Sequence, residues 1–161
     1  MKSLKSRLKA IRERIRRTKF RKTVEASVFI AVLLLALFSR QILSVVTGSS
    51  VPLAVVDGYS MCPTLREGDL VISYKAPPED IHTGDIIIYK SYSGELIIHR
   101  VIKVVKINGE YYYITKGDNN KAPDPYKIPY DRVEGKVLEV SDGVVLKIPY
   151  LGYLSLWIHR R

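Results

Sequence analysis

The sequence contains very little cysteine: Cys62 is the single one among 161 residues. One cysteine excludes an intrachain disulfide framework, so the fold has to be stabilised by a hydrophobic core. Histidine is also scarce, with three residues, which leaves few candidates for imidazole chemistry. Cys62 stands two residues after Ser60 and directly before Pro63. We interpret it as a small apolar side chain and not as a nucleophile.

Net charge is absent from most of the chain. Residues 1–22 hold eleven lysines and arginines against one acid, Glu13, which accounts for the whole formal charge of +10. Residues 23–161 hold fifteen charges of each sign and sum to zero. A basic isoelectric point would suggest a nucleic-acid-binding protein, but the basic residues gather in one terminal tail. We therefore expect no specific nucleic-acid partner.

Long hydrophobic runs are absent except for one near the amino terminus. Residues 26–39 carry no charge, and the apolar character resumes after Arg40 and Gln41 as far as Val46. As one helix, residues 26–46 would be about 31 Å long, which is enough to cross a bilayer. We predict a cytoplasmic tail over 1–23, a signal-anchor helix over 24–46 and an exterior domain over 47–161. The preceding cations place the amino terminus inside the cell.

Two parts of this prediction have alternatives. The apolar run could belong to a cleaved signal peptide, although its charged region would then be unusually long. The tail has an apolar stripe that suits a membrane surface, but the same residues could be a solvated charge run. The stripe consists of Leu4, Leu8, Ile11 and Ile15.

Beyond Thr47 the pattern changes to short runs rich in valine, isoleucine and tyrosine, which is typical of strands. The turn signals between them include Asn108-Gly109, the strongest hairpin signal in the chain. No helical period of useful length appears here. The sequence therefore predicts a mainly β domain with irregular connections. The candidate strands are 53–57, 69–73, 85–90, 95–106, 111–116, 133–140 and 144–148.

Two further features of this domain have a structural interpretation. Gly68-Asp69 and Gly84-Asp85 each precede a strand run, and we interpret both aspartates as structural. The segment 149–161 is apolar and aromatic, but it is too short to span a bilayer. It suits a membrane interface, and the alternative is a last strand packed on the core.

A serine, a histidine and two aspartates form the candidate chemistry. Ser60 lies in a loop bounded by Gly58 and Pro63, where a sharp turn exposes its hydroxyl group and a backbone N–H. Serine needs a base to accept its proton, and His99 lies in a strand run on the same face as Ile97 and Val101. His82 and His159 have no such neighbours. A carboxylate should orient the imidazole, and Asp118 and Asp124 are both candidates.

Four sequence boxes carry a resemblance to a known family. The first runs from Ser60 to Leu65 and continues with 68–71; the others are 84–89, 99–101 and 117–124. With these boxes, over roughly residues 27–155, the chain resembles the type I signal peptidases. His99 stands where the bacterial branch has lysine, so the resemblance is to the archaeal and endoplasmic-reticulum branch.

The resemblance implies a role for each site residue. Ser60 would be the nucleophile, His99 the general base and Asp124 the acid of the triad, with Asp118 supporting. It also implies antiparallel sheets and no cofactor or metal. Some members carry a serine two residues before the nucleophile; here that position is Gly58, so we expect backbone donors at the oxyanion.

The resemblance also implies what the protein does. It would be a membrane-bound serine endopeptidase at the cell membrane that removes amino-terminal signal peptides from exported preproteins, after small residues at positions −1 and −3. Its expected partners are preprotein signal peptides and the lipid bilayer, and contacts with secretion machinery stay open.

Three other classes of protein explain fewer features of the sequence. A non-catalytic, membrane-anchored β module that binds exported chains would not need both Ser60 and His99. A self-cleaving repressor-type protease would not need the apolar span. A membrane-tethered RNA- or ribosome-binding protein would use the basic tail, but no aromatic stacking platform accompanies the tail.

Overall fold

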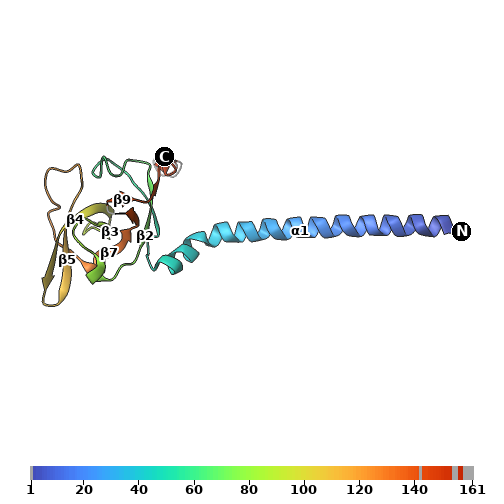
Figure 1. Ribbon diagram of the computed structural model, residues 1–161, viewed down its shortest axis with the longest axis horizontal. Coiled ribbons are helices and arrows are strands. Elements are labelled where there is room, and N and C mark those ends of the chain that lie inside the picture. The colour runs from blue at the N-terminus through green and yellow to red at the C-terminus, as the bar shows by residue number, and fades with distance from the viewer. Residues whose placement is uncertain (1, 142, 154–155, 158–161) are drawn as a thin grey trace. The chain divides into compact units, whose positions relative to one another are not determined.

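The computed structural model of the chain describes residues 2–141, 143–153 and 156–157 (Figure 1). Side chains at 2–16, 18, 19 and 40 are outside this description, so the predicted apolar stripe of the tail and His159 fall outside it as well. The chain divides into two compact units, Met1–Ser39 and Arg40–Arg161.

One helix, α1 (Lys2–Thr47), includes the predicted tail and the predicted span. Its segment Phe20–Ser39 is long and apolar enough to cross a membrane, with a mean hydropathy of 1.9 and none of it buried inside the protein. The helix ends where Thr47 Oγ1 donates to Leu43 O, and the Thr47 carbonyl accepts from Lys75 N. The boundary between tail and span at residue 23 stays a prediction.

The second unit is an antiparallel β domain, as predicted. The strand order of its main sheet is β1-β2-β7-β3-β4-β5-β6, and β10 also pairs with β2. A separate two-stranded sheet joins β8 and β9. The strands are β1 (Leu53–Val55), β2 (Leu70–Tyr74), β3 (Ile86–Lys90), β4 (Leu96–Ile107), β5 (Glu110–Lys116), β6 (Ile128–Pro129), β7 (Val133–Val137), β8 (Glu139–Ser141), β9 (Val144–Val145) and β10 (Lys147–Ile148).

Strand β3 is buried on both faces and divides the core in two. Ile87 and Tyr89 belong to one hydrophobic cluster, and Ile86 and Ile88 belong to the other. This burial explains why β3 is a continuous apolar run and does not alternate with polar residues. Strand β4 pairs with β3 along residues 96–100, so the site on β4 rests on the best-buried strand of the domain.

The hairpin predicted at Asn108-Gly109 is confirmed. Strands β4 and β5 pair up to Ile107 and Glu110, and the two turn residues have positive φ angles of 52° and 88°. Two consecutive positive angles are the signature of the tight turn that joins twisted strands, and Asn-Gly is the pair that adopts them most readily.

Most predicted strands occur in place, with four differences. The run 133–140 is two strands, β7 and β8, because the chain breaks at Leu138 and changes sheet. The run 144–148 is also two strands, because β9 pairs with β8 and β10 pairs with β2 of the main sheet. Strand β6, two residues long, has too little pattern to be predicted. At the carboxyl end, Tyr153, Leu156 and Trp157 are helical, so the alternative of a last strand over 149–161 is wrong for these residues. The contact of this segment with a membrane interface stays a prediction.

Candidate active site

Ser60 lies in the loop between β1 and β2, in a turn closed by the hydrogen bond from Cys62 N to Tyr59 O at 3.1 Å. Two neighbouring side chains, Met61 and Leu65, are almost completely buried and anchor the loop in the core. Gly58 has φ of 98°, in the region that favours glycine. Because glycine has no side chain, no hydroxyl group is present two residues before Ser60.

His99 lies on β4, opposite Ile87 of β3, and is 7% exposed. Its Nε2 lies 3.1 Å from Ser60 Oγ, and its Nδ1 lies 2.7 Å from Asp124 Oδ2. The ring therefore bridges a hydroxyl group and a carboxylate, and the three side chains that the resemblance implies as the triad meet. Since Val101 and Ile97 belong to or pack on the same core cluster, the predicted face of His99 is also found.

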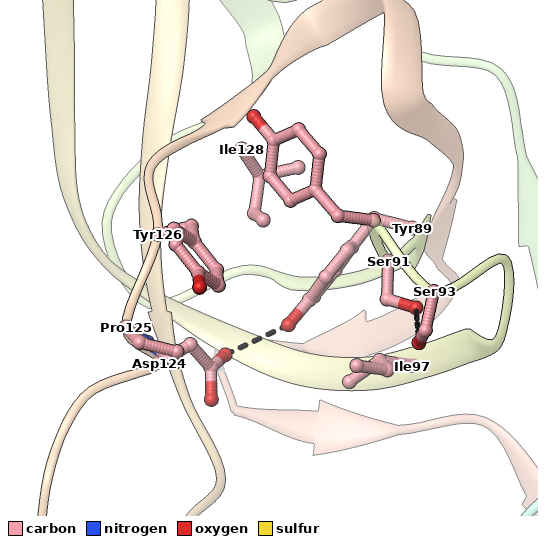
Figure 2. Close-up of a pocket in the computed structure, with 9 residues that line it drawn as sticks. Tyr89, Ser91, Ser93, Ile97, Asp124, Pro125, Tyr126 and Ile128 are labelled. Atoms are coloured by element: carbon pink, nitrogen blue, oxygen red, sulfur yellow. Dashed lines mark hydrogen bonds between the residues drawn. The ribbon is translucent and has the colours of Figure 1, made fainter.

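Asp124 Oδ2 receives hydrogen bonds from two further side chains. Thr115 Oγ1 donates at 2.6 Å and Tyr89 OH at 2.8 Å, the latter drawn as a dashed line in Figure 2. Burial by itself raises the pKa of Asp124, but the hydrogen bonds from His99, Thr115 and Tyr89 outweigh it and lower the pKa. The carboxylate is thus kept ionised.

An ionised Asp124 determines which nitrogen of His99 carries the proton. A carboxylate only accepts hydrogen bonds, so Nδ1 has to carry the hydrogen that points at Asp124. In the neutral ring Nε2 is then left with a lone pair directed at Ser60. Burial raises the pKa of Tyr89, which keeps its phenol protonated as a donor to the same carboxylate.

Asp118 has different hydrogen-bond partners from Asp124 and does not contact His99 in the structure. Its two carboxylate oxygens accept from Arg100 Nε at 2.8 Å and from Arg100 Nη2 at 2.7 Å, and Thr64 Oγ1 donates to Oδ2 at 2.6 Å. Burial raises the pKa of Asp118, but these hydrogen bonds, with the charge of Arg100, lower it overall. The bidentate pair with Arg100 ties the loop after β5 to β4, and the hydrogen bond from Thr64 ties the same loop to the serine loop.

The loop after β5 also contacts the nucleophile's own backbone. Asn119 N donates to Ser60 O at 2.8 Å, and Asn119 Nδ2 donates to Tyr59 O at 3.2 Å. Together with Asp118, these contacts fix Ser60 against the segment that also carries Asp124.

A groove lies beside Ser60 and His99. Its volume is about 270 Å³. In the described ladders β1 pairs with β2 only, and residues 96–99 of β4 pair with β3 only, because the pairing of β4 with β5 begins at Arg100. The groove therefore runs between two strand edges. Its lining consists of Val55, Val56, Asp57, Ser60, Met61, Leu96, Ile97, Ile98 and His99.

His82, Asp69 and Asp85, for which the sequence predicts no catalytic role, lie outside the active site. His82 is exposed, and its backbone N–H donates to Asp85 Oδ2 at 2.6 Å. Asp85 pairs with Lys136 and Asp69 pairs with Lys147, each at 2.7 Å, so both aspartates are structural as predicted. Among the described residues, no three or more histidine, cysteine or acidic side chains gather as they would for a metal ion.

Sequence reasoning assigned no role to Tyr89, Thr115, Arg100 or Thr64. The sequence contained one signal for Thr115. Residues two apart in a strand point to the same face, so Thr115 is a polar residue at an inward position of β5, next to the inward Tyr113. Since Thr115 pairs with Val101, it shares the face of His99. No local pattern marks Tyr89, whose phenol meets Asp124 across 35 residues of sequence.

Comparison with known proteins agrees with this geometry. The Peptidase S24-like family matches residues 35–138, well over half of the chain. The signal peptidase complex catalytic subunit SEC11 of Plasmodium falciparum is 33% identical, over 81% of this chain and 71% of that protein. The sec11 subunit of Schizosaccharomyces pombe is 32% identical, over 79% and 77%.

The human subunit SEC11C is 37% identical over 71% of this chain, and the alignment spans 60% of the length of the human protein. An uncharacterised protein of Methanocaldococcus jannaschii is 29% identical, over 65% of this chain and 82% of that protein. The chain therefore belongs to the Peptidase S24-like family and, within it, to the serine peptidases of the signal peptidase type.

Proposed function

We propose that the protein is a membrane-bound serine endopeptidase that removes amino-terminal signal peptides from exported preproteins. The observation that carries this proposal is the hydrogen-bonded series Ser60–His99–Asp124, with Nε2 lying 3.1 Å from Oγ. The similarity to signal peptidase catalytic subunits supports the choice of substrate.

In the proposed reaction Ser60 attacks the carbonyl carbon of the scissile bond. His99 Nε2 accepts the hydroxyl proton as the bond forms, and the charged ring is stabilised by Asp124 through Nδ1–H. The proton then passes from Nε2 to the leaving amine. Water hydrolyses the acyl-enzyme by the same route, with His99 again accepting and returning the proton.

The oxyanion requires hydrogen-bond donors. Within residues 40–141, Ser60 N–H donates no backbone hydrogen bond, so it is free for a ligand. Because Gly58 has no side chain, we assign the oxyanion to backbone donors at the serine loop.

The groove supports the proposal of cleavage after small residues. An extended peptide between the edges of β1 and β4 would form backbone hydrogen bonds and point alternate side chains into the protein. Val56, Met61 and Ile98 form the apolar part of the lining, beside the polar groups of the groove, and we propose that this part fits alanine, glycine or serine at −1 and −3. Larger groups would be excluded by overpacking. A preprotein with alanine at both positions should be cleaved, and phenylalanine at either should stop cleavage.

The test uses the full chain in detergent with one synthetic preprotein, and the new amino terminus is sequenced. Ser60→Ala should abolish cleavage, while the matched variant Cys62→Ser should keep most of it. His99→Ala should lower the rate by about 10²- to 10⁴-fold, the usual size of general-base catalysis. Normal cleavage by Ser60→Ala would refute the assignment of the nucleophile.

A further inference from the structure

A second pocket lies on the other side of Asp124 and has no part in the steps above. Its volume is about 350 Å³. Figure 2 shows it between the turn after β3, strand β4 and the segment that follows Asp124. Its lining consists of Tyr89, Ser91, Tyr92, Ser93, Ile97, Asp124, Pro125, Tyr126 and Ile128.

Two exposed tyrosines form its outer wall. The rings of Tyr92 and Tyr126 meet edge to face, with centroids 5.3 Å apart, although the side chains come from different segments. Arg132 holds this wall in place, because its guanidinium lies 4.1 Å from the Tyr92 ring centroid and donates to Ser91 O at 3.0 Å. The wall is thus ordered before any ligand arrives.

The serine hydroxyls and the Tyr89 phenol of this pocket already have partners inside the protein. Ser91 Oγ and Ser93 Oγ lie 2.8 Å apart, within hydrogen-bond distance, and Tyr89 OH donates to Asp124. The floor is apolar, with Ile128 buried and Ile97 half-buried. The surface left for a ligand is therefore mostly carbon and aromatic ring, which suits an apolar side chain and above all an aromatic one, since rings pair favourably edge to face.

Ile97 connects this pocket to the groove at Ser60, because its side chain lines both. Side chains along β4 alternate between faces: Ile98 packs with one core cluster, and Ile97 packs with the other. A peptide strand paired with the edge at 96–99 alternates in step with β4, since residues opposite each other point to the same face.

This alternation assigns a substrate position to the pocket. Pairing of an incoming strand has to end near His99, because β5 occupies the edge of β4 from Arg100 onward. The residues before the cut then lie along 96–98. If −1 and −3 share the face of Ile98, residue −2 lies on the face of Ile97, beside the second pocket. Resting on the proposed function, we propose that this pocket binds the side chain at −2 and selects an apolar, preferably aromatic, residue there.

The ionised carboxylate of Asp124 adds a second element of selectivity. It is part of the lining, so an acidic side chain at −2 would meet like charge as well as an apolar surface. We therefore expect the order phenylalanine, then alanine, then aspartate at −2.

The experiment measures kcat/KM for preproteins that have alanine at −1 and −3 and differ only at −2. The full chain is used in detergent. Phenylalanine should be preferred to alanine by about tenfold, the lower end of what an apolar pocket discriminates. Tyr126→Ala removes a wall, and Ser93→Trp fills the space from an exposed position. Both should reduce the preference to near one, with cleavage of the alanine substrate measured for each variant as the reference.

Two controls accompany these variants. Ser93→Ala removes the hydroxyl group without filling the pocket, and Tyr112→Ala removes a tyrosine of β5 outside it; both should keep the preference. An equal preference in wild type, Tyr126→Ala and Ser93→Trp would overturn the assignment while the peptidase function stands, and so would a dependence on +1 in place of −2. If wild type cleaves none of the substrates, the proposed function itself fails.

Discussion

At the scale of single residues, the two aspartates of one loop are separated by their partners. Asp124 contacts His99, Thr115 and Tyr89, and Asp118 contacts Arg100 and Thr64. One carboxylate faces the imidazole that changes charge during the reaction, while the other holds a guanidinium that stays charged throughout. Their substitution should therefore affect different quantities.

Asp124→Asn should lower the turnover number by about 10²- to 10⁴-fold, because the amide cannot stabilise the imidazolium ion. Asp118→Asn should lower it less and instead reduce the free energy of unfolding by about 1–3 kcal/mol, the cost of weakening hydrogen bonds to a charged partner. Single-turnover cleavage and chemical denaturation followed by circular dichroism measure the two effects. The opposite ranking in folded variants would transfer the orienting role to Asp118.

The lowered pKa of Asp118 makes a prediction about acid stability. A carboxyl group whose pKa is lower in the folded than in the unfolded chain stabilises the fold above the unfolded value, 3.8 for aspartate. This contribution is lost as pH falls through the lower, folded value. Wild type should thus be more stable than Asp118→Asn near neutral pH, and the gap should shrink below about pH 4. Denaturation of both proteins from pH 7 to pH 2.5 measures it, and a gap independent of pH would contradict it.

At the scale of elements, β4 connects most of the site. It carries His99 and Arg100, pairs with β3 at one end and with β5 at the other, and leaves the edge at 96–99 open between them. The hairpin at Asn108-Gly109 sets the register of β5 as far as the pair Lys103 and Ile114, and a shift in register between Val101 and Lys103 then places Thr115 opposite Val101.

Gly109→Val should reduce the free energy of unfolding by about 1–3 kcal/mol, because a β-branched residue is strained at φ of 88°. Asn108→Gly is the matched control, since glycine accepts the φ of 52° at that position without strain. Thermal unfolding followed by circular dichroism compares the three proteins. Equal loss in both variants would mean that the turn's side chains, and not its backbone angles, stabilise the hairpin.

At the scale of the whole molecule, one apolar helical segment precedes a β domain whose charges balance. The excess of cations is confined to residues 1–22, and the candidate site belongs to the unit Arg40–Arg161. If the helix spans the bilayer, this asymmetry places the tail in the cytoplasm and the site on the opposite side, where exported chains emerge.

Cysteine labelling tests this orientation. In a Cys62→Ser background, Lys106→Cys near the exposed hairpin should react with a membrane-impermeant maleimide added to intact cells. Ser6→Cys in the tail should react only after the membrane is permeabilised. Labelling of Ser6→Cys alone in intact cells would reverse the topology and separate the site from exported substrates.

The sequence by itself determined the β class of the domain, most of its strands, the hairpin turn and the apolar segment. It could do so because these features depend on periodicity, turn chemistry and hydrophobicity over a few residues. It also indicated Ser60 and His99 as candidates, because the residues around each one carry a local signal. Ser60 lies in a predicted sharp turn, and His99 lies at an inward position of a predicted strand.

The family resemblance implied Asp124 as the acid of the triad, but the spacing of the residues did not, and only the tertiary structure shows that Asp124 is the aspartate that contacts His99. Asp118 and Asp124 lie in the same loop, and no spacing rule distinguishes them; the choice depends on Asp124 N donating to Thr115 O at 2.8 Å and on Arg100 engaging Asp118. The roles of Tyr89 and Thr115, the open edge of β4 and the pocket behind Ile97 are likewise products of strand pairing. Each joins residues far apart in the chain, so no local pattern encodes them.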